Sequence, residues 1–125
     1  MTHRSRLAAL VIDCRTGDLD AAAAFWAAAL GLETHPGDAP NYVDLGKTAG
    51  GLQVEVQAVD HDSRVHLDIA ADDIPAEVAR LERLGAREVA EVQTWTVMQA
   101  PTGHRFCVIS GRTEAFRASA HVWEE

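Results

Sequence analysis

Alternating apolar and polar residues predict a strand at residues 65–70, and a helix follows it directly. Every second residue from Val65 to Ile69 is apolar, so one face of this strand is apolar and the other can carry polar groups. Asp73 is suited to cap the N-terminus of the helix, and Gly85 is suited to end it. His66 lies on the face that this helix would leave uncovered. His66 is therefore the first candidate for a chemical centre.

Two segments have the apolar spacing of helices that cover one side of a sheet. The first begins at Asp18 and ends at Gly31, and the second spans Asp73–Leu84. The apolar face of the first holds Leu19, Ala23, Trp26 and Leu30. The apolar face of the second holds Ile74, Val78, Leu81 and Leu84. We expect both faces to pack in the core.

Further strands are predicted by short apolar or alternating segments. They are Leu7–Cys14, Leu32–His35, Tyr42–Leu45, Leu52–Val56, Arg87–Val92, Thr94–Gln99 and Arg105–Ile109. Each half of the chain then runs strand, helix and three strands, and VIDCRTGDLDAAAA aligns without gaps with HLDIAADDIPAEVA, which places Asp13 on Asp68. A unit that occurs only twice predicts a pseudo-twofold domain rather than a solenoid. The short connections after each helix favour antiparallel pairing.

Composition and charge exclude several classes of function. A chain of 125 residues is one domain, and its 47% hydrophobic and 24% charged residues are ordinary for a globular protein. A formal net charge of -8 without a basic stripe excludes nucleic acid and anionic membrane surfaces as partners. No apolar run approaches the length of a membrane span. Cys14 and Cys107 lack metal or redox spacing, which indicates reduced thiols in the cytoplasm, with Cys14 inert in the core.

Four segments of the chain resemble the vicinal-oxygen-chelate (VOC) superfamily, and within it the glyoxalase-like members. They are VIDC (11–14), FWAAALGL (25–32), VHLDIAADDIPAEVARLERLGA (65–86) and APTGHRFCVI (100–109). The superfamily includes glyoxalase I, extradiol dioxygenases and bleomycin-resistance proteins. The resemblance implies an α+β fold in which two βαβββ modules form one open, barrel-like cleft.

The resemblance also implies the domain limits. We expect a single domain over residues 1–111, with module one at about 6–58 and module two at about 64–111. In the tail, residues 112–125, Phe116, Ala120 and Trp123 have helical spacing. This tail would form either a short amphipathic helix or a frayed end.

Enzymes of this superfamily hold a divalent metal with one ligand from the first and last strands of each module. Carried over, these ligand positions fall on Ala9 or Val11, on Glu55 (with Gln53 and Gln57 as alternatives), on His66 and on Cys107. Neither Ala9 nor Val11 can bind a metal, so the ligand set is incomplete. Glu55 and His66 remain the metal candidates, for zinc, nickel, manganese or iron. The default expectation is that no cofactor is held.

The candidate residues each have more than one interpretation. His66 would be a metal ligand, a ligand-contacting or acid–base residue, or a half-buried histidine bonded to a neighbour such as Asp68 or Glu55. Glu55 would be a general base or a solvated carboxylate. Cys107 would complete a soft His–Glu–Cys zinc site or fill space on the last strand. Asp13 and Asp68 would face each other across the pseudo-twofold or end their strands in solvent.

The remaining candidates would line the cleft. Tyr42 and Trp95 would form flat walls for an aromatic ligand, or pack in the core. Gln53, Gln57, Asp68 and Cys107 would supply further contacts to the ligand.

The leading hypothesis is a glyoxalase-like protein that binds a small organic molecule, such as an aromatic natural product, without a tightly held metal. One alternative is a metal-dependent lyase, isomerase or dioxygenase that uses Glu55, His66 and Cys107. Another is a non-catalytic association domain. Because members of the superfamily often dimerise, we expect a homodimer, either ordinary or with exchanged modules.

Overall fold

The computed structural model describes residues 2–124, which form two compact units. Unit 1 combines residues 2–8 with residues 67–124, and unit 2 comprises residues 9–66. The elements in chain order are β1 (Thr2–Arg15), α1 (Leu19–Leu30), β2 (His35–Pro36), β3 (Tyr42–Lys47), β4 (Gln53–Val59), β5 (Arg64–Ala71), α2 (Ile74–Arg83), β6 (Arg87–Val92), β7 (Trp95–Gln99), β8 (Arg105–Ser110), α3 (Glu114–Ser119) and β9 (His121–Glu124). The strand β1 contributes its first half to unit 1 and its second half to unit 2.

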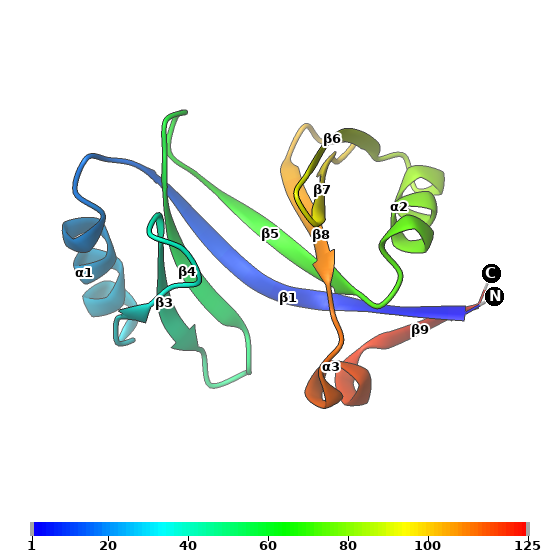
Figure 1. Ribbon diagram of the computed structural model, residues 1–125, viewed down its shortest axis with the longest axis horizontal. Helices are drawn as coiled ribbons and strands as arrows, with labels where there is room; N and C mark the ends of the chain where they lie inside the picture. Colours follow the sequence, from blue (N-terminus) through cyan, green and yellow to red (C-terminus); the bar gives the residue numbers. More distant parts are fainter. Residues whose placement is uncertain (1, 125) are drawn as a thin grey trace. The chain divides into compact units, whose positions relative to one another are not determined.

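Unit 2 is a sheet with the strand order β2-β3-β4-β1 and α1 packed beside it (Figure 1). The second half of β1 runs parallel to β4, while β3 is antiparallel to both β4 and β2. Asp18 caps α1 by accepting a hydrogen bond from the backbone N–H of Ala21 at 3.1 Å. Gly31 ends the helix with φ of 71°, a left-handed conformation that favours glycine. Both predicted ends of α1 are confirmed.

The core of unit 2 lies between α1 and one face of this sheet. It joins Ala23 and Ala27 of the helix to Ile12, Cys14, Leu45, Val54 and Val56 of the strands. The small alanine side chains let the helix approach the sheet closely. Cys14 lies in the core, as predicted. Burial raises the pKa of its thiol, and the adjacent Asp13 carboxylate adds to this rise, which disfavours the reactive thiolate.

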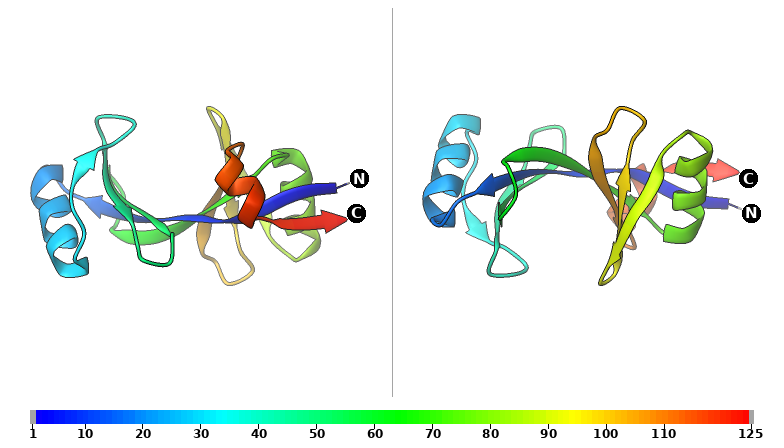
Figure 2. Two further views of the ribbon diagram at one scale, coloured as in Figure 1. Left: turned by 90° about the horizontal axis from the view of Figure 1, so that it is seen from below. Right: turned by 90° about the horizontal axis from the view of Figure 1, so that it is seen from above.

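Unit 1 repeats this order of elements. Its sheet runs β5-β8-β7-β6, with β5 parallel to β8 and the other pairs antiparallel. The strand β9 pairs antiparallel with the beginning of β1, and Figure 2 shows the two side by side. The core joins α2 to the sheet through Ala71, Val78, Leu81, Met98 and Val108.

The prediction that Leu30 and Leu84 pack in the core is wrong. Leu30 is 48% exposed, because all three residues of the last turn of α1 are exposed beyond its core contacts. Leu84 is 66% exposed, because it lies at the C-cap of α2, beyond Leu81, the last residue of this helix in the core cluster. On β5 the core contacts are confined to the end of the strand, so Val65 and Leu67 are also exposed.

Two predicted elements differ from those observed. The strand expected at Leu32–His35 begins only at His35, because the register partners of β2 on β3 are Asp44 and Val43. In the tail, a short helix (α3) is present, but Trp123 belongs to the strand β9. Pairing with β1 therefore determines the conformation of Trp123, and helical spacing does not.

The predicted fold class is confirmed: the chain is α+β, and each half has the order βαβββ. After each crossover helix the strands are paired antiparallel, as the short connections predict. Within residues 2–124, no helix has the length and apolar character that crossing a bilayer requires.

A buried ionic cluster in unit 1 centres on Glu77 of α2, which is 0% exposed. Its Oε1 accepts hydrogen bonds from His3 Nε2 and Arg80 Nε, both at 2.8 Å, and its Oε2 accepts one from Arg80 Nη2 at 2.9 Å. Burial opposes ionisation of this carboxyl, but the hydrogen bonds from Arg80, His3 and Ser5 outweigh burial and lower the pKa of Glu77. Glu77 is therefore an anion that His3 and Arg80 stabilise by hydrogen bonds.

The same cluster attaches the strand β9. The Arg80 guanidinium lies 3.9 Å from the ring centroid of Trp123, a cation–π contact. The indole N–H of Trp123 donates to Ser5 Oγ at 2.8 Å. Because Ser5 belongs to β1 and Arg80 to α2, one side chain of β9 connects both elements.

Candidate functional site

Asp13 and His66 form a hydrogen-bonded pair in unit 2. His66 Nδ1 lies 2.8 Å from Asp13 Oδ2, and the side chains are 13% and 3% exposed. An ionised Asp13 carboxylate can only accept hydrogen bonds, so it would hold His66 in the tautomer that carries its proton on Nδ1. Asp13 thereby fixes the tautomer and the orientation of the ring. In this tautomer Nε2 is the basic nitrogen, the arrangement of an acid–base histidine held by a carboxylate.

The second oxygen of Asp13 is unsatisfied. Among the described residues, Asp13 Oδ1 has no hydrogen-bond partner although it is buried. Arg64 does not supply one, because its Nε lies 4.0 Å from the other oxygen, Oδ2, and its side chain is 48% exposed. A buried acceptor without a donor costs about 1–3 kcal/mol, and such groups concentrate at functional sites.

Polar side chains gather on the face of β4 that points away from α1. Gln53, Glu55 and Gln57 alternate with the core residues Val54 and Val56, and all three are half-buried. Gln57 is the register partner of Asp13 on β1. This register places the β4 candidates on the sheet face that also carries Asp13.

The strand β3 extends this polar face. Tyr42 pairs with Gln57, and Asp44 pairs with Glu55. The Gln53 amide donates to Asp44 Oδ1, and Asp44 also accepts from the backbone N–H of Gly46 at 2.6 Å. Asp44 thus orients Gln53, although no pattern in the sequence marks Asp44 as a site residue.

The other candidates, Asp68, Trp95 and Cys107, belong to unit 1. Asp68 on β5 and Cys107 on β8 are register partners, and each offers a metal-ligand atom within 4.8 Å of the other. Trp95 is half-buried on β7, two residues before Val97, which pairs with Cys107. His66 precedes Asp68 by two residues on β5.

The sequence pattern that defines a family of glyoxalase-like domains matches residues 9–109 of this chain. The chain belongs to the glyoxalase-like domain family. It is therefore a member of the VOC superfamily, as the four matching segments predict. No curated protein matches the sequence.

Solved structures show the same fold at low sequence identity. A hypothetical protein, BH1468 from Bacillus halodurans C-125, superposes with a TM-score of 0.65 at 11% identity, covering 88% of this chain and 96% of that one. The NAD-dependent benzaldehyde dehydrogenase structure from Legionella pneumophila gives a TM-score of 0.62 at 9% identity, covering 82% and 99%. At such identities the likeness concerns the fold alone.

The glyoxalase-like domain does not reproduce the superfamily's metal-ligand set in unit 2. Val11 is the register partner of Glu55, has no donor atom and is 1% exposed. Asp13, two residues further along β1, uses Oδ2 to hold His66. Because the first-strand ligand is missing, we derive no chemical step through a metal in this domain.

The structure gives Asp13 a contact that the sequence pattern does not predict. Of its two interpretations, the one in which Asp13 ends its strand in solvent is wrong, since the side chain is 3% exposed. Its contact with His66 joins residues 53 positions apart, which alternation along one strand cannot reveal. The internal repeat singled out Asp13 but gave no partner for it.

Proposed function

We propose that this glyoxalase-like domain binds a small organic molecule at the polar face of β1 and β4, without a tightly held catalytic metal. The observation that carries the proposal is the buried, unpartnered Oδ1 of Asp13 beside His66. A ligand with a hydroxyl or N–H group would provide the missing donor once it displaces the atoms that cover Oδ1. Half-buried Tyr42, on the neighbouring strand, favours an aromatic ligand.

Each side chain has a chemical role in this proposal. Asp13 positions His66, and His66 donates to or accepts from the ligand through its imidazole. Gln53 and Gln57 supply neutral hydrogen bonds, and Glu55 accepts one. In unit 1, Trp95, Asp68 and Cys107 remain ligand-contact candidates on their own sheet. The cytoplasmic location and the homodimer stay predictions, and the dimer is tested by light scattering of the purified protein.

The first test compares Asp13→Asn with Asp20→Asn, an exposed position in the first turn of α1. The probes are phenol, catechol and hydroxylated benzamides, titrated by calorimetry. We expect saturable binding of at least one probe, weakened about 10-fold by Asp13→Asn because a charge-assisted hydrogen bond contributes about 1.5–3 kcal/mol. Asp20→Asn should leave the affinity unchanged.

Imidazole ¹⁵N spectra test whether Asp13 positions the His66 ring or only supports the fold. We expect His66 to hold its proton on Nδ1 in the parent protein, and to change tautomer populations in Asp13→Asn while the fold is intact. No saturable binding by any probe, or equal affinities in both variants, would overturn the proposal.

A second candidate function, a metal-dependent lyase, isomerase or dioxygenase, is favoured by one observation. Asp68 and Cys107 offer two ligand atoms within 4.8 Å of each other, and a carboxylate with a thiolate suits zinc.

Treatment with a chelator distinguishes the two functions. We expect chelator treatment to leave the thermal midpoint and probe affinity unchanged, because the first-strand ligand is absent. Stoichiometric zinc that Cys107→Ser or His66→Ala removes would instead favour the enzyme.

A further inference from the structure

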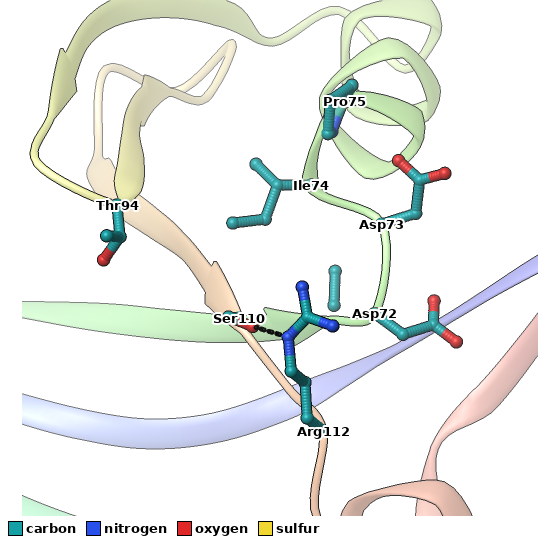
Figure 3. Close-up of a pocket in the computed structure, with 8 residues that line it drawn as sticks. Asp72, Asp73, Ile74, Pro75, Thr94, Ser110 and Arg112 are labelled. Carbon is teal, nitrogen blue, oxygen red and sulfur yellow. Dashed lines mark hydrogen bonds between the residues drawn. The ribbon is translucent and has the colours of Figure 1, made fainter.

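Unit 1 contains a pocket that the proposed function does not use. It has a volume of about 590 Å³ and lies where β5 passes into α2, beside the end of β8 and the β6–β7 turn. Volumes of about 300–1,000 Å³ are typical of small-molecule sites. Figure 3 shows Ile74 extending into the pocket between Thr94 and the first turn of α2. The pocket therefore has an apolar wall on its α2 side.

One cation, Arg112, reaches into this pocket. Its Nε donates to Ser110 Oγ at 3.0 Å, which holds the guanidinium below Ile74 (Figure 3). Within residues 2–124, the terminal nitrogens of Arg112 make no hydrogen bond or ion pair. A guanidinium anchored at Nε presents its remaining N–H groups as a fork, which matches the two oxygens of a carboxylate.

Two aspartates at the same pocket limit the charge of a ligand. Asp72 Oδ1 accepts the backbone N–H of Arg4 at 2.7 Å, and Asp73 Oδ1 accepts that of Ala76 at 3.0 Å. Each carboxylate thus has a local role in building the loop and the start of α2. Their negative charges, in a chain of net charge -8, disfavour a dianion such as phosphate more than a single carboxylate.

We propose that this pocket binds a small organic monocarboxylate, with its carboxylate on Arg112 and its apolar body against Ile74. Thr94 also lines the pocket, and its hydroxyl would bond to a further polar group of the ligand. This site lies wholly in unit 1, whereas Asp13 and His66 lie in unit 2. It therefore shares no residue with the site proposed above.

The test is an amide NMR titration of the full chain with hexanoate and benzoate, and with inorganic phosphate as the competing anion. We expect saturable shifts at Ile74, Thr94 and Ser110 with the carboxylates and an affinity for phosphate at least 5-fold lower. Arg112→Gln should weaken carboxylate binding about 10-fold or more. The matched control is Arg117→Gln, which removes an exposed arginine of α3 and should have no effect.

Three results would overturn this inference. They are absence of saturable shifts at the pocket, equal carboxylate affinity in Arg112→Gln and Arg117→Gln, and phosphate binding as tight as that of hexanoate. Asp13→Asn separates the two proposals, because it should weaken the binding of the phenolic probes and leave the binding of hexanoate unchanged.

Discussion

Glu77→Ala should lower the free energy of unfolding by about 3–5 kcal/mol, because it removes one member of a buried ionic cluster and leaves the others uncompensated. His3 and Arg80 both donate to this carboxylate, and His3 is only 4% exposed. Urea denaturation at pH 7 measures the change. Loss of the anion should also loosen β9, since Arg80 contacts Trp123.

The matched control for Glu77→Ala is Glu82→Ala, which removes the same charge from an exposed position of the same helix. Surface substitutions of this kind change stability by about 0.5 kcal/mol or less. Similar losses in both variants would contradict the importance of the cluster. Hydrogen exchange provides a second readout: amides of β9 should exchange faster in Glu77→Ala and not in Glu82→Ala.

The lowered pKa of Glu77 also predicts the direction of the pH dependence. A carboxyl whose pKa is lower in the folded state stabilises the fold fully above its unfolded pKa, about 4.3 for glutamate. This stabilisation is lost as the pH falls from there through the folded pKa, because the unfolded state binds its proton first. Unfolding free energies measured between pH 7 and pH 3 should fall more steeply in the parent protein than in Glu77→Gln, with His3 and Arg80 present in both.

Leu81→Ala and Leu84→Ala should differ sharply in the stability that they cost, although both substitutions remove the same side-chain atoms. Leu81 is 8% exposed in the core of unit 1, so its truncation leaves a cavity and costs about 2–5 kcal/mol. Leu84 is 66% exposed, and its truncation should cost about 0.5 kcal/mol or less. Urea denaturation of the two variants measures the difference. Equal losses would mean that the C-cap position packs in the core in solution.

The same two leucines show what apolar periodicity can and cannot predict. Helical spacing puts Leu81 and Leu84 on one face, but only Leu81 packs in the core of unit 1. Whether the face of a residue is covered depends on where the helix ends relative to the sheet. Element type and order were therefore predictable, whereas burial at the ends of elements was not.

In the candidate site, too, some features were predictable from the sequence and others depend on the fold. The alternation of Gln53, Glu55 and Gln57 against valines predicts their shared face from the sequence alone. The pairing of Asp13 with His66 depends on the fold that brings residues 53 positions apart together. Trp123 is a comparable case, since its position is set by a hydrogen bond to Ser5, which lies 118 positions away. Contacts of this kind leave no periodic signal.

The division of β1 between the two units has a consequence for synthesis on the ribosome. Unit 2 needs only residues 9–66, so its contacts can form while the second half of the chain is still being made. Unit 1 needs residues 2–8 as well, and His3 meets Glu77 across 74 positions. Residues 2–8 are therefore made well before the partners that they contact, and a fragment that starts at residue 67 lacks the strand that β9 pairs with. A rearranged chain that begins at residue 67 and joins residue 124 to residue 2 through a short linker would remove this delay.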